Sequence, residues 1–293
     1  MQKKANIKYI LAVLLFGSNG IFAMQISLNS YEIVFLRAML GSLFLFAVFF
    51  LSRRKLDFLN RQKRQLLFII LSGIAMGTSW MFLYEAYQQI GVGIATLLYY
   101  CGPVIVMALS PILFRERLTW LKGIAFFVVL CGILLINGQA IQHGTTFWGL
   151  FCGGMSAVTY AVMVIFNKRA KDIIGLENAV IQLVVGFLTV AVFVGIKQGY
   201  TFQIGNNDWL PILILGLLNT GIGCYLYFSS ISKLPVQTIA VCGYLEALSA
   251  VVLSIIVLRE AMLAIQVLGG ILIISGAIFG EWISSTEKVK NNE

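Results

Sequence analysis

The sequence predicts an all-α integral membrane protein with ten transmembrane helices, arranged as two inverted five-helix repeats around a central cavity. Hydrophobic residues make up 59% of the 293 residues and charged residues only 11%, whereas an average soluble domain carries about 25% charged residues. Apolar runs of about 20 residues follow one another, and each can cross a hydrocarbon core of about 30 Å as a helix. Because lipid offers no partners for backbone N–H and C=O groups, the spans must be helices and not strands.

Each predicted span has about 19–23 residues, which is the length that a membrane helix requires. The spans cover residues 7–25, 31–52, 66–88, 92–114, 119–137, 146–166, 177–197, 208–229, 236–258 and 262–283. With the N-terminus in the cytoplasm, all but three of the 21 Lys and Arg residues fall on the cytoplasmic side, and the exceptions are Lys197, Arg259 and Arg37. Because cytoplasmic loops are enriched in Lys and Arg, this distribution predicts a multi-pass protein of the cell (plasma) membrane with both termini in the cytoplasm.

The net charge of +9 does not indicate a nucleic-acid partner, because the basic residues lie between the apolar runs and not along one face. The five cysteines all lie in apolar runs without CxxC spacing, and the single histidine, His143, falls in a predicted outer loop. We therefore expect no metal site, no disulfide framework and no cofactor. The sequence has no P-loop pattern, so we do not expect ATP to drive its activity.

The second half of the chain repeats features of the first half at an offset of 144 residues. The matching positions are Arg115-Glu116 with Arg259-Glu260, Tyr100 with Tyr244, and Gly132 with Gly276. Since five helices per copy is an odd number, the second copy must cross the membrane in the opposite sense. We assign residues 1–140 to the first repeat and residues 141–293 to the second. Inverted repeats of this kind are typical of alternating-access carriers, which bind their substrate between the two halves.

The segment Ala95–Gly132 carries a distinctive combination of residues. They are Ala95-Thr96-Leu97-Leu98, Pro103, Arg115-Glu116-Arg117-Leu118 and Gly123, and the segment Ala240–Gly276 repeats the pattern. This combination closely resembles the signature of the EamA family within the drug/metabolite transporter superfamily, and Glu32–Ala38 resembles that family's second helix. The resemblance implies ten helices in two inverted halves, with a cavity lined mainly by spans one, three, four, six, eight and nine. Ala247 stands where the second copy often carries proline, so a helix break there would have to come from Gly243.

Ionisable groups within the apolar spans are few, and the ones that could carry function are Arg37, Glu85, Glu246 and, near an interface, Glu32. A charge at the bilayer centre costs about 2.5–3.5 kcal/mol, so each of them requires a reason. Glu246 lies near the middle of the ninth span, where it can hold a substrate amine or bind a proton during transport; the alternative is a structural carboxyl bonded to a neighbouring helix. Arg37 and Glu85 either form an ion pair that braces two helices, or Arg37 faces the cavity and binds a carboxylate.

Aromatic and amide side chains supply the remaining candidates for substrate binding. Trp80 and Tyr84 are four residues apart and share one helix face. The other candidates are Tyr99, Asn219, Tyr244 and Asn19. A buried phenol or amide needs a hydrogen-bond partner, which a cavity wall can provide, whereas aromatic residues at the membrane interface are often anchors only. The spacing of Gly73 and Gly77 predicts close helix packing and no chemistry.

Together these predictions favour a secondary active transporter, and specifically an exporter, of a small amphipathic metabolite such as an amino acid, an amine or a nucleoside-like compound. It would work by alternating access, with the lipid bilayer and the small-molecule substrate as partners and the proton as a candidate coupling ion. We expect no enzymatic activity, because no nucleophile or metal constellation lies at membrane depth. The alternative is a membrane channel or a helical membrane protein without transport, although an aqueous pore normally shows rings of repeated polar residues. The sequence leaves the oligomeric state open.

Overall fold

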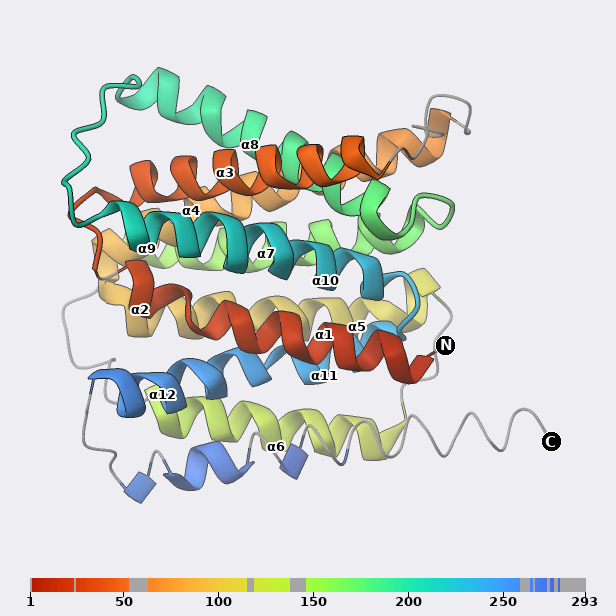
Figure 1. Cartoon of the computed structure of the whole chain (residues 1–293). Coiled ribbons are helices and arrows are strands. Elements are labelled where there is room, and N and C mark those ends of the chain that lie inside the picture. The colour runs from red at the N-terminus through yellow and green to blue at the C-terminus, as the bar shows by residue number, and fades with distance from the viewer. Residues whose placement is uncertain are drawn as a thin grey trace.

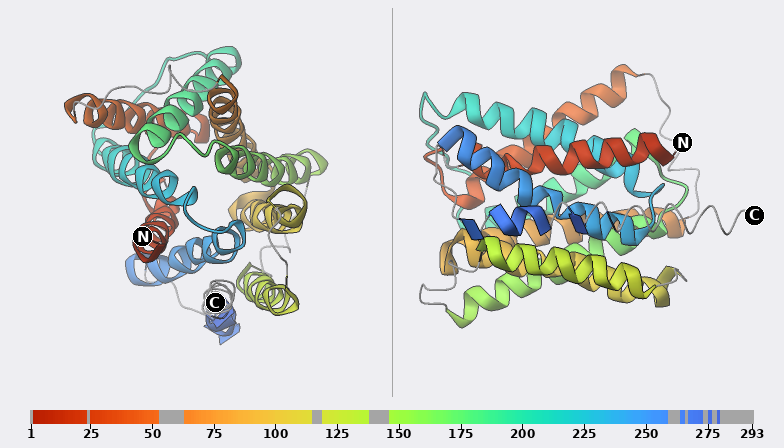
Figure 2. Two further views of the ribbon diagram at one scale, coloured as in Figure 1. Left: turned by 90° about the vertical axis from the view of Figure 1, so that its right-hand side faces the viewer. Right: turned by 90° about the horizontal axis from the view of Figure 1, so that it is seen from below.

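The computed structural model describes residues 2–23, 25–52, 63–114, 119–137, 146–258, 264–265, 267–272, 275–276 and 279. Over these ranges every regular element is a helix, which confirms the predicted all-α class for this part of the chain. The long helices lie side by side along a common direction (Figure 1), and the left-hand view of Figure 2 looks along that direction.

Thirteen helical elements make up the described part of the chain. They are α1 (Gln2–Gly17), α2 (Asn19–Ala23), α3 (Ser30–Leu51), α4 (Lys63–Tyr99), α5 (Cys101–Phe114), α6 (Trp120–Asn137), α7 (Phe147–Arg169), α8 (Gly175–Lys197), α9 (Trp209–Leu213), η3 (Ile214–Ile222), α10 (Gly223–Ile231), α11 (Val236–Gly243) and α12 (Leu245–Leu258). The element η3 is a π-helix, so the eighth predicted span consists of α9, η3 and α10.

Six of the described segments are long and apolar enough to cross a membrane. They are Lys3–Ala23, Ser30–Leu51, Lys63–Ile90, Phe147–Arg169, Gly175–Lys197 and Trp209–Ile231. These segments coincide with the first, second, third, sixth, seventh and eighth predicted spans. The protein is therefore a multi-pass membrane protein by the length and composition of its helices.

The other four predicted spans are represented differently. The fourth ends in the 14-residue helix α5, and the fifth is the 18-residue helix α6. The ninth is divided into α11 and α12. Half of the tenth lies outside the described residues, as do the Arg-Glu pairs at 115–116 and 259–260. The count of ten helices and their division into two repeats therefore stay predictions.

Two pairs of consecutive helices, α4 with α5 and α11 with α12, are each separated by a single residue. We predicted a boundary near residue 90, but α4 stays helical to Tyr99 and the interruption falls at Tyr100. Pro103 explains this position, because it has no backbone N–H to donate to the carbonyl of Tyr99 and is tolerated in the first turn of the helix that follows. The second interruption, at Tyr244, directly follows Gly243, the residue from which any break in this span was expected to come.

The outer surface and the helix packing both fit a membrane environment. Large apolar side chains such as Phe50 and Ile196 are 77% and 84% exposed, as expected for residues that face lipid. Inside the bundle, a Cβ atom at Gly77 would lie 2.7 Å from the carbonyl oxygen of Gly186. This distance shows that α4 and α8 approach closely, which confirms the packing predicted from the spacing of Gly73 and Gly77.

Candidate functional site

A cavity of about 730 Å³ lies within the bundle, with walls from α1 to α5, α7 and α10 to α12. Among the residues predicted from the sequence, Asn19, Arg37, Trp80, Tyr84, Tyr99 and Glu246 line it. Asn219, Tyr244 and Glu85 do not line it. Small-molecule sites typically have volumes of about 300–1,000 Å³, so this cavity has room for a metabolite.

Arg37 enters the cavity from α3 and is held by three other side chains. Its Nε donates a hydrogen bond of 3.0 Å to Thr220 Oγ1, and its Nη1 donates one of 3.3 Å to the hydroxyl of Tyr84. The guanidinium also lies 4.9 Å from the ring centre of Trp80, which is a cation–π geometry. Arg37 is only 5% exposed. A buried guanidinium with neutral partners is suited to binding an anionic group such as a carboxylate.

The π-helix η3 places Thr220 beneath Arg37. The Thr220 hydroxyl donates a hydrogen bond of 2.8 Å to the carbonyl of Leu215, five residues earlier. It therefore accepts from Arg37 and donates to the backbone at the same time. Single π-turns in helices occur frequently at functional sites.

Glu246 reaches the cavity from the first turn of α12, two residues beyond the interruption at Tyr244. A carboxylate in the first turn of a helix is favoured by the positive end of the helix dipole. Within the described ranges, this carboxylate makes no hydrogen bond and no ion pair; only the backbone carbonyl of Glu246 is bonded, to Ser249 Oγ at 2.9 Å. The structural alternative required a bond to a neighbouring helix, whereas this geometry leaves the carboxylate able to bind a cation or a proton.

Aromatic side chains form much of the wall of the cavity that Arg37 and Glu246 also line. The rings of Tyr99 and Tyr160 pack edge to face, with centres 5.3 Å apart. The hydroxyls of Tyr160 and Tyr227 lie 3.2 Å apart, within hydrogen-bond distance. Tyr9 donates a hydrogen bond of 2.8 Å to the carbonyl of Ile239 in α11. These contacts produce a wall that is apolar over its ring faces and polar at its hydroxyls.

Asn219 and Tyr244 bond to the backbone or to other side chains instead of facing the cavity. Asn219 Nδ2 donates to Ser18 Oγ at 2.7 Å and to Asn19 Oδ1 at 3.0 Å, at the point where α1 gives way to α2. The hydroxyl of Tyr244 donates a hydrogen bond of 2.9 Å to the carbonyl of Tyr100. Both side chains are fully buried and bond to residues that line the cavity, Asn19 and Tyr100.

The predicted ion pair between Arg37 and Glu85 is wrong. Glu85 Oε2 instead pairs with Lys197 Nζ at 2.9 Å, and its other oxygen accepts a hydrogen bond of 3.3 Å from Trp148 Nε1. The reason is the helix period: Glu85 follows Tyr84 directly, so it is turned about 100° away from the face that Tyr84 presents to Arg37. Glu85 therefore connects α4 to α7 and α8, outside the cavity.

The sequence did not predict one cavity residue, Tyr87, or two residues that bind predicted ones, Thr220 and Lys197. Tyr87 lies seven residues after Trp80, so it shares the face of Trp80 and Tyr84 and could have been found by extending that face. Thr220 carries no such signal, because a threonine in an apolar span is common. Lys197 was predicted only to lie on the outer side; it binds Glu85 and also donates to the hydroxyl of Tyr31 at 2.7 Å.

Comparison with known proteins places this geometry in context. The sequence pattern described as the EamA-like transporter family matches residues 3–138 and again residues 147–280. The chain is 26% identical over 280 residues to the uncharacterized transporter YxxF of Bacillus subtilis, an alignment covering 94% of this chain and 88% of that protein. It is 28% identical over 265 residues to the threonine/homoserine exporter RhtA of Escherichia coli K12, covering 87% and 81%. One solved crystal structure has the same fold with a TM-score of 0.83 and 18% identity, covering 97% of this chain and 100% of that one.

Proposed function

The chain belongs to the EamA-like transporter family, and we propose that it is a secondary active transporter that exports a small amphipathic metabolite by alternating access. The relatives named above are transporters, which points away from an enzyme. The proposed substrate class is the zwitterionic amino acids, with amines and nucleoside-like compounds as less complete matches to the cavity.

The observation that carries this proposal is that Arg37 and Glu246 line the same aromatic cavity. An amino acid presents a carboxylate and an ammonium group, so it can bind the guanidinium at one end and the carboxylate at the other. The aromatic rings that line the same cavity can cover the side chain of the substrate. The threonine/homoserine exporters among the relatives act on compounds of this class by their names, which supports the proposal.

The proposed architecture is ten helices in two inverted halves, residues 1–140 and 141–293. The two family matches begin at residues 3 and 147, which are 144 residues apart. Tyr100 and Tyr244 have the same separation, both stand at one-residue helix interruptions, and the second donates a hydrogen bond to the first. Interrupted helices at the interface of two repeats are the usual place for substrate and coupling-ion sites in carriers.

The proposed setting is the cell membrane, with both termini in the cytoplasm. The distribution of Lys and Arg between the spans supports this orientation. Glu246 is the proposed binding site for a coupling proton, because its carboxylate faces the cavity and has no partner within the described ranges. Binding of a proton there would compete with binding of the substrate ammonium group, which couples the two fluxes.

Counterflow of labelled amino acids in proteoliposomes tests the proposal. Wild-type protein should give saturable uptake that responds to an imposed pH gradient. Glu246→Gln should abolish the response to pH and reduce flux at least tenfold, and Arg37→Gln should reduce the apparent affinity for the carboxylate-bearing substrate. The matched control is Glu32→Gln, because Glu32 is in a capping box on Asn29 and glutamine preserves that bond.

Two outcomes would contradict the proposal. Flux that does not saturate and ignores the gradient would indicate a channel. If flux through both Glu246→Gln and Glu32→Gln responded to the pH gradient as the wild type does, Glu246 would not bind the coupling proton. Transport itself would still be established.

A further inference from the structure

A second pocket, of about 520 Å³, shares no lining residue with the central cavity. It is formed by the start of α4, the end of α5, and the end of α7 with the turn that follows. These ends lie on the side of the bundle where the N-terminus is marked in Figure 1. The pocket therefore lies at the ends of these helices, at the depth where a membrane helix meets the lipid headgroups.

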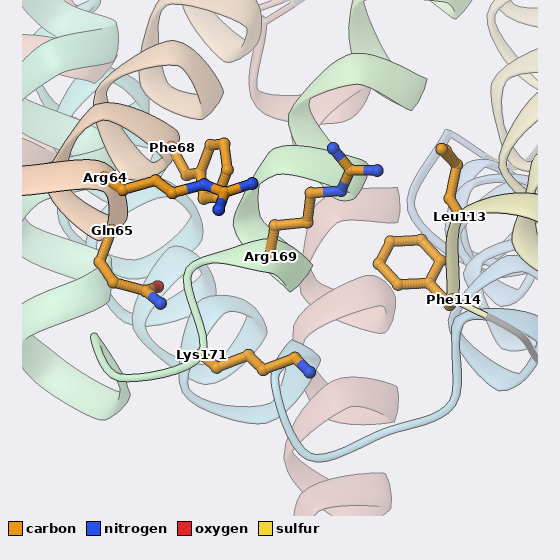
Figure 3. A pocket seen from close by; sticks show the side chains of 7 residues that line it. All are labelled: Arg64, Gln65, Phe68, Leu113, Phe114, Arg169 and Lys171. Atoms are coloured by element: carbon orange, nitrogen blue, oxygen red, sulfur yellow. The ribbon is translucent and has the colours of Figure 1, made fainter. Parts of the chain in front are cut away.

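Three cations surround this pocket: Arg64 on α4, Arg169 on α7, and Lys171 on the following turn. Figure 3 shows the guanidinium groups of Arg64 and Arg169 extending toward the same region. None of the three forms an ion pair with a carboxylate among the described residues. Arg64 is also held over the ring of Phe68, at 5.4 Å from the ring centre. Like charges placed together in this way repel one another, so a bound anion would stabilise the arrangement.

Gln65 adds a requirement for a hydrogen-bond donor. Its side-chain Oε1 is buried and has no hydrogen-bond partner among the described residues, which is a costly condition for a polar atom. It lines the same pocket as the three cations. A ligand that combines an anionic oxygen with a hydroxyl group would satisfy both the cations and Gln65.

Apolar side chains complete the lining of the pocket. Phe68 lies beside Arg64, whereas Figure 3 shows Leu113 and Phe114 on the side opposite Arg64. Inorganic phosphate would gain nothing from these side chains, whereas the glycerol backbone and the first methylenes of a lipid chain would pack on them. Basic pockets between transmembrane helices are known to hold anionic lipid headgroups.

We propose that this pocket binds the headgroup of an anionic phosphoglycerol lipid. The phosphodiester lies between Arg64, Arg169 and Lys171, a headgroup hydroxyl donates to Gln65 Oε1, and the acyl end packs against Leu113 and Phe114. The arrangement would fix the end of α7 against those of α4 and α5. This site is independent of the transport cavity, and its test does not require transport.

The test is a titration of the purified full-length protein in neutral detergent, followed by melting temperature and by native mass spectrometry. The probes are short-chain phosphatidylglycerol, phosphatidylcholine of the same chain length, and inorganic phosphate. Phosphatidylglycerol alone should bind and raise the melting temperature. Arg64→Gln, Arg169→Gln and Lys171→Gln should each weaken this binding about fivefold, the contribution of one basic residue near an anionic lipid surface.

The matched control is Lys233→Gln, which removes an exposed cation that does not line the pocket and should leave binding unchanged. Lipid-free melting temperatures show whether each variant is folded, and exposed Lys171 provides a substitution that disturbs no packing. If inorganic phosphate raised the melting temperature as much as phosphatidylglycerol, the ligand would be a soluble anion and the assignment to a lipid would be overturned. Equal binding of phosphatidylcholine, or equal losses in Lys233→Gln, would also overturn it.

Discussion

Substitution of Tyr244 by phenylalanine isolates one hydrogen bond that joins the two helix interruptions. The Tyr244 hydroxyl donates to the carbonyl of Tyr100 at 2.9 Å, and Tyr244 is 0% exposed. Phenylalanine preserves the ring contacts with Tyr100 and Phe126, whose centres are each 5.9 Å away. An average buried hydrogen bond contributes about 0.5–1.5 kcal/mol net, and interhelical bonds in a bilayer average about 0.6 kcal/mol. Because no water can replace this donor, we expect a loss of about 1 kcal/mol in Tyr244→Phe.

The assay is reversible unfolding of the full chain by SDS in mixed micelles, with Tyr200→Phe as the matched control. The Tyr200 hydroxyl also donates to a backbone carbonyl, that of Ala191, at 2.9 Å, but Tyr200 is 56% exposed. Water can replace this bond, so Tyr200→Phe should change the free energy of unfolding by less than about 0.5 kcal/mol. If both variants lose the same free energy, burial does not determine the value of the bond and the reasoning is refuted.

Two further predictions concern helix packing and the ion pair outside the cavity. Gly77→Ala should destabilise the protein by about 1–3 kcal/mol, because its Cβ would lie 2.7 Å from the Gly186 carbonyl oxygen. A Cβ atom at Gly154 in α7 would meet nothing within 4 Å, so Gly154→Ala should be neutral or stabilising by up to about 1 kcal/mol. Equal changes in melting temperature for Gly77→Ala and Gly154→Ala would contradict this prediction. For Glu85 and Lys197, whose side chains are 14% and 41% exposed, a double-mutant cycle should give a coupling below about 1 kcal/mol that falls with added salt. A coupling of 2 kcal/mol or more that is insensitive to salt would contradict it.

Hydropathy predicted the helices well because the constraint behind it is severe. In lipid every backbone polar group must be satisfied within the protein, so an apolar run of sufficient length has one available conformation. The sequence also named Gly243 as the residue at which any break in the ninth span would occur, and the interruption follows it. The predicted boundary between the third and fourth spans, near residue 90, does not interrupt the helix, which continues to Tyr99. The interruption at Tyr100 was not predicted, although Pro103 lies close to it. The π-helix Ile214–Ile222 could not be predicted, since its apolar pattern differs little from that of an α-helix.

The site was predicted in part, and the missing part depends on which helices are neighbours. Trp80 and Tyr84 could be placed on one face from their spacing alone. The partners of Arg37 and Glu85 could not, because Thr220 and Lys197 come from parts of the chain more than 100 residues away. A single sequence gives the depth of each helix residue but not the order in which the helices pack. Two charges at similar depth were therefore paired wrongly.

The irregular backbone of this bundle is concentrated around the cavity. At three places a side chain supplies a hydrogen bond where regular helix is lost: Asn219 where α1 ends, Tyr244 at the carbonyl of Tyr100, and Thr220 at the carbonyl of Leu215. Such irregular backbone is tolerated at membrane depth only where protein or a cavity surrounds it. The polar residues of the spans thus have two tasks. Arg37 and Glu246 line the cavity, while Asn219 and Tyr244 hold the helix ends at the interruptions next to it.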